Sequence, residues 1–172
     1  LLPQATAPSS NTAEGAVTWD SDDDLLFVGD GSAAIGMGGF IMGSASVIAF
    51  TVDEFCAPVG TGGTTANSAC NATEGNVDTF TAPMALVCDN LYAVVNTAAG
   101  TGNSWIVTLR TGSAGSLSNT SLTCTMSNAT SCNLTGTLVT VSAGQIMTVG
   151  WDANTTVTST GGQGFSFRCR PQ

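Results

Sequence analysis

The stretch Trp105-Ile-Val-Thr-Leu-Arg110 decides the fold class, because large apolar residues recur in it at every second position. Trp105, Val107 and Leu109 fall on one face of an extended strand, and the residues between them fall on the other. Phe165 and Phe167 alternate in the same way near the end of the chain. A strand with one apolar face buries that face against a second layer, so the pattern predicts an all-β sandwich.

Short β-prone runs recur along the rest of the chain, separated by clusters of Gly, Asn, Asp and Ser. Strands of this length with turn signals between them are typical of a sandwich or barrel, and we expect about ten of them. The expected ranges are 16–19, 25–28, 39–52 (one long bent strand or two), 85–89, 91–96, 105–110, 121–126, 136–141, 146–151 and 164–169.

Composition narrows the class of protein further. The 172 residues suit one domain with a core large enough to fold unaided. Only 9% of residues are charged, whereas exposed helix faces need Glu, Lys and Arg. Lysine and histidine are absent, and three arginines stand against twelve carboxylates, which gives a net charge of -9. Because nucleic acids and anionic membranes select basic patches, we expect neither as a partner.

The cysteines indicate disulfides. Their number is even, histidine is absent, and no Cys-X-X-Cys spacing occurs, so zinc ligation is disfavoured. Disulfides place the protein outside the cytosol, and we expect a secreted, extracellular or cell-surface location. The six residues are Cys56, Cys70, Cys88, Cys124, Cys132 and Cys169.

Spacing suggests how the cysteines pair. Cys124 and Cys132 flank a turn-rich segment and are expected to bond across a hairpin. A Cys56–Cys70 bridge would constrain the polar insertion between residues 55 and 79. Cys88 and Cys169 then remain, and their bond would tie an early sandwich strand to the last one.

The N-terminal residues 1–15 differ from the rest of the chain. They are rich in Pro, Ser, Ala and Thr and lack aromatic residues, a composition that is disordered unless something holds it. A neighbouring subunit and the chain's own domain are equal candidates. We therefore expect an extended arm over residues 1–15 and a single domain over residues 16–172. The expected subunit contacts are Leu1, Leu2, Pro3, Ala5 and Ala7.

We expect no membrane insertion. An opening Leu1-Leu2-Pro3, without an initiator methionine or a basic region, is expected of a secreted chain whose signal peptide has been removed. The most apolar stretch, residues 35–50, contains four glycines and falls short of the ~20 residues that a helical span needs.

The order of features over residues 80–167 resembles a jelly-roll module, similar to tumour-necrosis-factor-like folds, that recurs in phage structural proteins and bacterial secreted or surface proteins. The resemblance implies a jelly roll and a structural role, and it carries no catalytic residues to transfer. The motifs that carry it are Thr81-Ala-Pro-Met84, Leu91-Tyr-Ala-Val94, Gly100-Thr-Gly-Asn-Ser-Trp105, Val107-Thr-Leu-Arg110, Leu122-Thr-Cys-Thr-Met126, Cys132 and Val139-Thr-Val-Ser-Ala-Gly-Gln-Ile-Met147.

The sequence contains no pattern typical of an enzyme, and we expect no enzymatic activity. Without histidine or lysine it cannot form a Ser-His-Asp triad, a Schiff base or a phosphate-binding loop with its lysine. A glycosidase with two carboxylates would also need an aromatic-lined cleft, and aromatic residues make up only 6% of the chain. The carboxylates considered for such a pair are Asp53, Glu54, Glu74, Asp78 and Asp89.

Two kinds of non-protein group remain open. The acidic run Asp20, Asp22 and Asp24 could offer oxygen ligands to Ca²⁺, but Leu25 and Gly31 depart from the EF-hand pattern, and a solvated acidic loop is the simpler interpretation. Covalent glycans are the second group, since sequons can be glycan acceptors or simply surface turns. The five sequons begin at Asn71, Asn119, Asn128, Asn133 and Asn154.

Two functions follow from these observations. The first is a subunit of an extracellular filament, a homopolymer that grows head to tail when the N-terminal arm of one copy adds a strand to the sheet of the next. The second is a surface or virion decoration protein, or a carbohydrate-binding jelly roll, which would need an exposed aromatic platform. The aromatic candidates are Trp19, Tyr92, Trp105 and Trp151, and burial in the core is expected for Trp105 and Trp151.

Overall fold

The computed structural model describes residues 4–5, 12–21, 25–29, 31–32, 34–36, 39–46, 53–61, 70–77, 79–154, 157 and 162–171. Nearly all regular structure in these residues is β-strand, so the predicted all-β class is confirmed. The chain divides into two compact units, residues 1–40 with 170–172 and residues 41–169. The division therefore falls at residue 40, whereas we expected a boundary after residue 15.

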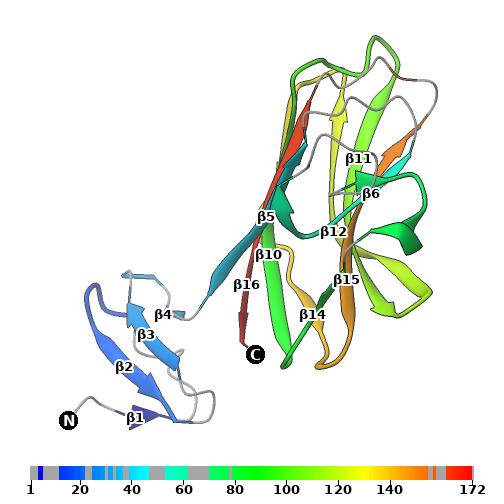
Figure 1. Cartoon of the computed structure of the whole chain (residues 1–172). Coiled ribbons are helices and arrows are strands. Elements are labelled where there is room, and N and C mark those ends of the chain that lie inside the picture. The colour runs from blue at the N-terminus through cyan, green and yellow to red at the C-terminus, as the bar shows by residue number, and fades with distance from the viewer. Residues whose placement is uncertain are drawn as a thin grey trace. The chain divides into compact units, whose positions relative to one another are not determined.

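The first unit contains a four-stranded sheet in the order β1-β2-β3-β4 (Figure 1). Strands β2 and β3 pair antiparallel, with Val17 opposite Val28. Strand β1 pairs parallel with β2 through Gln4 opposite Trp19 and Ala5 opposite Asp20. Part of the expected arm thus pairs within its own chain. The bounds are β1 Gln4–Ala5, β2 Val17–Asp20, β3 Leu25–Gly29 and β4 Ala34–Gly36.

The second unit is a sandwich of two sheets, which we call the β10 sheet and the β11 sheet (Figure 1). The β10 sheet has the order β13-β10-β16-β5-β7, and β14 also pairs with β10. Its strands are β5 Phe40–Ser46, β7 Val59–Thr61, β10 Leu86–Val95, β13 Ser131–Leu134, β14 Val139–Val141 and β16 Gln163–Pro171.

The β11 sheet has the order β12-β11-β15-β6-β8, and β9 also pairs with β15. A short 3-10 helix, η2 Glu74–Asn76, follows β8. The strands are β6 Glu54–Cys56, β8 Cys70–Asn71, β9 Phe80–Thr81, β11 Ser104–Ser113, β12 Ser116–Ser127 and β15 Ile146–Ala153.

The core lies between the two sheets and follows from the alternation in the sequence. Trp105, Val107 and Leu109 of β11 are fully buried, as predicted. The Trp105 ring meets that of Trp151 edge to face, with ring centroids 6.3 Å apart. Phe165 and Phe167 are buried on the same face of β16. Apolar area removed from water at about 25 cal/mol per Å² is the main stabilising contribution to such a core.

Several strands differ from their predicted bounds. The expected strands 85–89 and 91–96 are one strand, β10, in which Asn90 has a φ of 54°. Asparagine tolerates this left-handed conformation, so the strand continues past the residue that looked like a break. The short strands β4, β6 to β9 and β13 were not expected, because two to four residues carry little alternation. Residues 47–52 of the expected strand 39–52 lie outside the described residues.

Three disulfides are present, and they are the three expected pairs: Cys56–Cys70, Cys88–Cys169 and Cys124–Cys132. The expected hairpin between Cys124 and Cys132 is wrong, however. Strand β12 belongs to the β11 sheet and β13 to the β10 sheet, so the chain crosses between the layers after Ser127. The Cys124–Cys132 bond therefore joins the two sheets at one side of the sandwich.

No helix in the described part of the chain could span a membrane.

Candidate functional site

An ion pair lies on the outer face of the β11 sheet. Arg110, on β11, donates from Nε to Glu74 Oε1 at 2.7 Å and from Nη2 to Oε2 at 3.2 Å. The Thr148 hydroxyl also donates to Glu74 Oε1, at 2.7 Å. Arg110 further donates from Nη1 to Asn119 Oδ1 and from Nη2 to the carbonyl oxygen of Leu117. The three hydrogen bonds to Glu74 fasten the segment that contains η2 to the sheet.

A hollow of about 90 Å³ opens beside this ion pair. Gly150 makes room for it, because a Cβ at this position would lie 3.0 Å from Arg110 Cδ. The Arg110 guanidinium lies 5.3 Å from the centroid of the Phe55 ring, a cation–π distance. The side chains that give the hollow its character are Asp53, Phe55, Thr108, Arg110, Asn119 and Asp152.

The side chains that line the hollow carry a net negative charge. Burial tends to raise the pKa of Glu74, but hydrogen bonds from Arg110 and Thr148 and the arginine charge outweigh it, so that the pKa is lowered. Arg110 and Glu74 thus neutralise each other, while Asp53 and Asp152 add negative charge at the hollow. Asp53 Oδ1 accepts a hydrogen bond from the backbone N–H of Ala153 at 2.9 Å. A neutral ligand with hydroxyl groups suits such a lining better than an anion.

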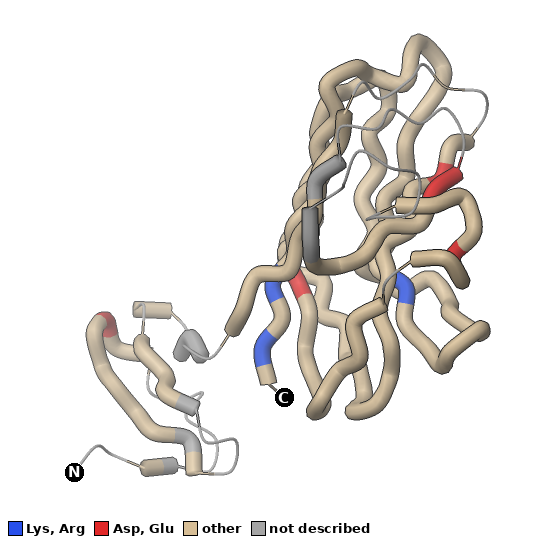
Figure 2. Tube along the Cα trace, in the orientation of Figure 1, with Lys and Arg blue, Asp and Glu red and all other residues tan. Residues whose placement is uncertain are grey.

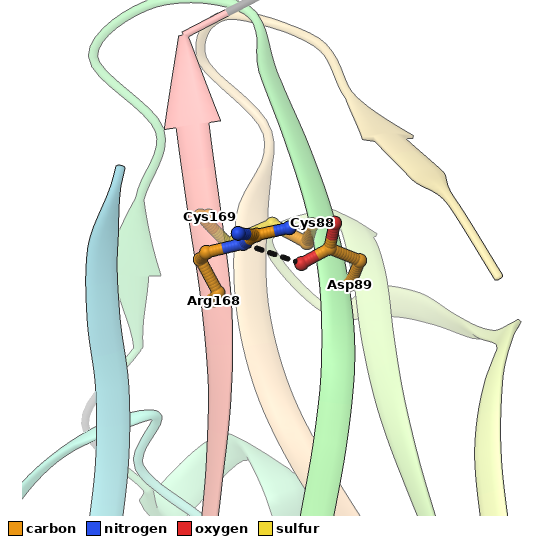
Figure 3. The surroundings of a disulfide bond; sticks show 4 residues. All are labelled: Cys88, Asp89, Arg168 and Cys169. Carbon is orange, nitrogen blue, oxygen red and sulfur yellow. Dashed lines mark hydrogen bonds and ion pairs between the residues drawn. A yellow bond between two sulfur atoms is a disulfide. The ribbon is translucent and has the colours of Figure 1, made fainter. Parts of the chain in front are cut away.

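The β10 sheet carries a second ion pair on its outer face, beside a disulfide (Figure 3). Arg168 Nε donates to Asp89 Oδ1 at 2.9 Å, and Nη2 donates to Oδ2 at 2.7 Å. The Asp89 side chain is 5% exposed and the Arg168 side chain 37%. The hydrogen bonds to Asp89 raise the pKa of Arg168. Because Cys88 and Cys169 are the adjacent residues, β10 and β16 are joined covalently on one face and ionically on the other.

Of the five carboxylates considered for a catalytic pair, the structure describes four. Glu74 is bound to Arg110, and Asp89 is bound to Arg168 on the other sheet. Asp53 precedes β6 and lines the hollow, Glu54 is the first residue of β6, and Asp78 lies outside the described residues.

The expected Ca²⁺ ligands receive no structural support. Asp20 ends β2, and Asp22 and Asp24 lie outside the described residues. Where the chain is described, no three His, Cys, Asp or Glu side chains are grouped to hold a metal ion.

Of the five residues expected to contact a neighbouring subunit, the structure describes one. Ala5 lies in β1, while Leu1, Leu2, Pro3 and Ala7 lie outside the described residues.

Four of the five sequon asparagines are exposed: Asn119, Asn128, Asn133 and Asn154. Asn71 is half-buried, and its Oδ1 accepts a hydrogen bond from the backbone N–H of Thr73. Asn119 lies on β12 and Asn133 on β13, so that the two sequons stand on different sheets.

The aromatic candidates do not form a platform. Trp105 and Trp151 are buried in the core, as predicted. Trp19 is half-buried in the first unit, and Tyr92 is exposed on the outer face of β10. The exposure of Val94 beside Tyr92 could not be predicted, because the run Leu91–Val95 is apolar at almost every position and does not show which face is buried.

Comparison with known proteins returned no match: no family model, no curated protein and no solved structure is similar to this chain.

Proposed function

We propose that the chain is a structural subunit of an extracellular filament that polymerises head to tail through its N-terminal strand. The observation that carries this proposal is the pairing of β1 with β2. Strand β1, which has two residues, pairs in parallel with the edge strand β2 of its own sheet. The pairing consists of only two residue pairs. So short a pairing is easily exchanged for the same pairing with a neighbouring copy, as in strand donation and domain swapping.

The strand order supports a jelly roll as the fold of this subunit. A jelly roll has eight strands wound from one long antiparallel hairpin into two Greek keys. Taken in chain order, the eight principal strands are β5, β6, β10, β11, β12, β13, β15 and β16. The first neighbours the eighth, the second the seventh, the third the sixth and the fourth the fifth. These are the pairings that such a wound hairpin requires.

The three disulfides support an extracellular location, since structural disulfides persist in oxidising compartments.

Deletion of residues 1–11 tests the proposal. The deletion removes β1 and leaves β2, β3 and β4 in place. We expect the shortened chain to remain folded, with the same thermal transition of the sandwich, and to lose polymerisation, as measured by sedimentation and electron microscopy. Filaments of normal length from the shortened chain would overturn the proposal.

A disulfide trap tests the exchange itself. Gln4 lies opposite Trp19 in the register, so the double variant Gln4→Cys, Trp19→Cys should link neighbouring copies into a ladder on a non-reducing gel. The pair Gln4→Cys, Glu14→Cys is the matched control, because Glu14 is exposed and lies outside β2. Intramolecular cross-links alone, under conditions in which filaments form, would contradict strand donation.

A carbohydrate-binding or decoration role is the second candidate, and the hollow on the β11 sheet favours it. Asp152 and Asn119 offer polar groups to sugar hydroxyls beside the Phe55 ring. A glycan array with the wild-type chain, followed by Asp152→Ala, tests this role. Binding that the substitution abolishes would support it, and the absence of binding to any glycan would reject it.

A further inference from the structure

One of the five sequons lies at the hollow on the outer face of the β11 sheet. Asn119, which begins the sequon Asn119-Thr120-Ser121, is exposed and lines the hollow. None of the other four sequon asparagines, all of which lie in the described residues, lines it. A residue of the type that carries N-linked glycans thus stands beside a hollow that suits a neutral ligand with hydroxyl groups.

An irregularity in β12 presents this asparagine. The register of β11 and β12 shifts between Thr108, which lies opposite Thr123, and Arg110, which lies opposite Asn119. The shift leaves extra residues on β12, as in a β-bulge, and bulges re-aim side chains. Strand β12 is also the last strand in the order of the β11 sheet. The sequon therefore lies in an irregular part of an edge strand.

Arg110 orients the amide of this asparagine. Arg110 Nη1 donates a hydrogen bond to Asn119 Oδ1. A guanidinium has only donors, so it selects the amide oxygen and not the amide nitrogen. The nitrogen Nδ2, to which an N-linked glycan is attached, is therefore the end of the amide that does not bind Arg110. Since Glu74 holds Arg110 in turn, the amide has a fixed position beside the hollow.

The hollow offers contacts to one sugar. Gly150 of β15 lies between Thr108 of β11 and Phe55 of β6 in one row across the three strands, so the middle of the row has no side chain. The Phe55 ring offers an apolar surface to the C–H groups of a sugar, and the exposed carboxylate of Asp152 can accept hydrogen bonds from its hydroxyl groups. A volume of about 90 Å³ limits the occupant to part of one sugar ring.

From these features we infer that Asn119 carries an N-linked glycan whose first sugar occupies the hollow. The donor is a lipid-linked oligosaccharide phosphate or diphosphate of a secretory pathway. The bond between C1 of the first sugar and the phosphate oxygen breaks, C1 bonds to Nδ2, Nδ2 gives up one proton, and the lipid phosphate or diphosphate leaves. The inference rests on the extracellular location that we propose, but it does not depend on polymerisation.

The attachment distinguishes this occupant from a free carbohydrate. A sugar bonded to Asn119 meets the hollow in an intramolecular contact, so its effective concentration there is far higher than that of a sugar in solution. A small, open hollow can therefore hold an attached sugar although it would bind the same sugar weakly from solution. The glycan and the hollow belong to one chain, and no partner molecule is needed.

The first test is glycopeptide mass spectrometry of the protein from its native source, which should find a glycan at Asn119. An unmodified Asn119 overturns the inference.

A pair of sequon variants tests the contact with the hollow. Ser121→Ala removes the hydroxyl residue of the sequon and keeps Asn119 with its bond to Arg110. Thr135→Ala is the matched control, because Thr135 is exposed like Ser121 and completes the sequon of the exposed Asn133 on the other sheet. Both are secreted from a eukaryotic cell line that adds N-linked glycans.

We expect Ser121→Ala to lower the midpoint of thermal unfolding by about 3 °C, because the sugar contacts are lost, and Thr135→Ala to leave it unchanged. The same variants made without glycosylation should melt like the unglycosylated wild type. Equal midpoints for the two glycosylated variants overturn the inference.

Trimming the glycan tests which sugar makes the contact. An endoglycosidase that leaves only the first sugar on Asn119 should leave the midpoint of the wild type unchanged. In a Phe55→Leu background, which keeps an apolar side chain and removes the ring, Ser121→Ala should have no further effect. A trimmed wild type that melts like Ser121→Ala, or an undiminished effect of Ser121→Ala in the Phe55→Leu background, overturns the inference.

The results separate this inference from the proposed functions. If filaments form from protein with an unmodified Asn119, the inference fails and the filament proposal stands. If Asn119 carries the stabilising glycan in a chain that stays monomeric at all concentrations, the inference stands and the filament proposal fails. If native Asn119 is unmodified and the chain binds free glycans in a way that Asp152→Ala abolishes, the inference fails and the carbohydrate-binding candidate stands.

Discussion

The outer face of the β11 sheet and the outer face of the β10 sheet differ in how far the chain covers them. The β11 sheet is tied to a segment of its own chain, since Glu74 of η2 reaches Arg110 and Thr148 and the Cys56–Cys70 bond anchors the segment. The β10 sheet leaves Tyr92 and Val94 exposed. The difference teaches that Glu74, Arg110 and Thr148 on the first face have partners within the chain, whereas Tyr92 and Val94 on the second are exposed to solvent.

Both sheets nevertheless combine an ion pair with a disulfide. Charged residues are sparse along the chain (Figure 2), yet each of the two ion pairs described lies close to a disulfide. Asp89 and Arg168 adjoin Cys88 and Cys169 on neighbouring strands. On the other sheet, Glu74 follows Cys70 by four residues. The following substitutions test how much each disulfide and each ion pair contributes to the free energy of unfolding.

The largest effect is expected from the double variant Cys88→Ser, Cys169→Ser. This disulfide closes a span of 81 residues, and the chain-entropy model gives it about 4 kcal/mol. The variant Cys56→Ser, Cys70→Ser opens a span of only 14 residues and should lose about 3 kcal/mol. Urea unfolding of the two variants measures the difference. A greater loss for the shorter span would contradict this ranking.

The next effect is expected from Arg168→Met, which removes the partner of a carboxylate whose side chain is 5% exposed. Loss of a hydrogen-bonded charge partner should cost about 2 kcal/mol in the free energy of unfolding. The double variant Asp89→Asn, Arg168→Met is the control, and it should recover part of the loss because no buried charge remains. An unchanged stability in the single variant would show that the pair is dispensable.

A smaller and pH-dependent effect is expected from Glu74→Gln. The folded chain lowers the pKa of Glu74, so its carboxylate contributes stability above the unfolded pKa of about 4.5, and this contribution is lost as the pH falls through the folded pKa. The variant should therefore unfold at a lower temperature than the wild type at pH 7, and the gap should narrow below pH ~4. A gap that is constant with pH would exclude this origin.

The smallest effect, with the opposite sign, is expected from Glu54→Gln. Burial raises the pKa of Glu54, so the folded state binds this proton more tightly, and stability falls as the pH rises from the unfolded pKa through the folded one. The variant should be slightly more stable than the wild type at pH 7 and should lose this advantage at low pH. Thermal melting across the pH range, compared with Glu74→Gln, gives the two signs side by side.

The sequence predicted the parts of the fold that local alternation and spacing determine. The buried face of Trp105, Val107 and Leu109 and the three disulfide pairs were expected and are present. The crossing between Cys124 and Cys132 was missed, because a turn-rich segment leads equally well to a hairpin or to the opposite sheet.

The candidate sites were less predictable than the fold. Arg110 and Glu74 are 36 residues apart in sequence, and nothing local links them. The exposure of Val59 and Val94 was also missed, because which outward residues of a strand remain uncovered depends on the neighbouring strands. Val59, for example, joins Gly43 only through a parallel pairing of short strands.

The scarcity of basic residues has a consequence for digestion. Proteases of the trypsin type cut after lysine or arginine in flexible segments, and this chain has no lysine. Arg110 stands in a strand that is paired on both sides, Arg168 lies in the strand between β10 and β5, and Arg170 is followed by Pro171. All three arginines thus lie in paired strands, and we expect the folded protein to resist such enzymes.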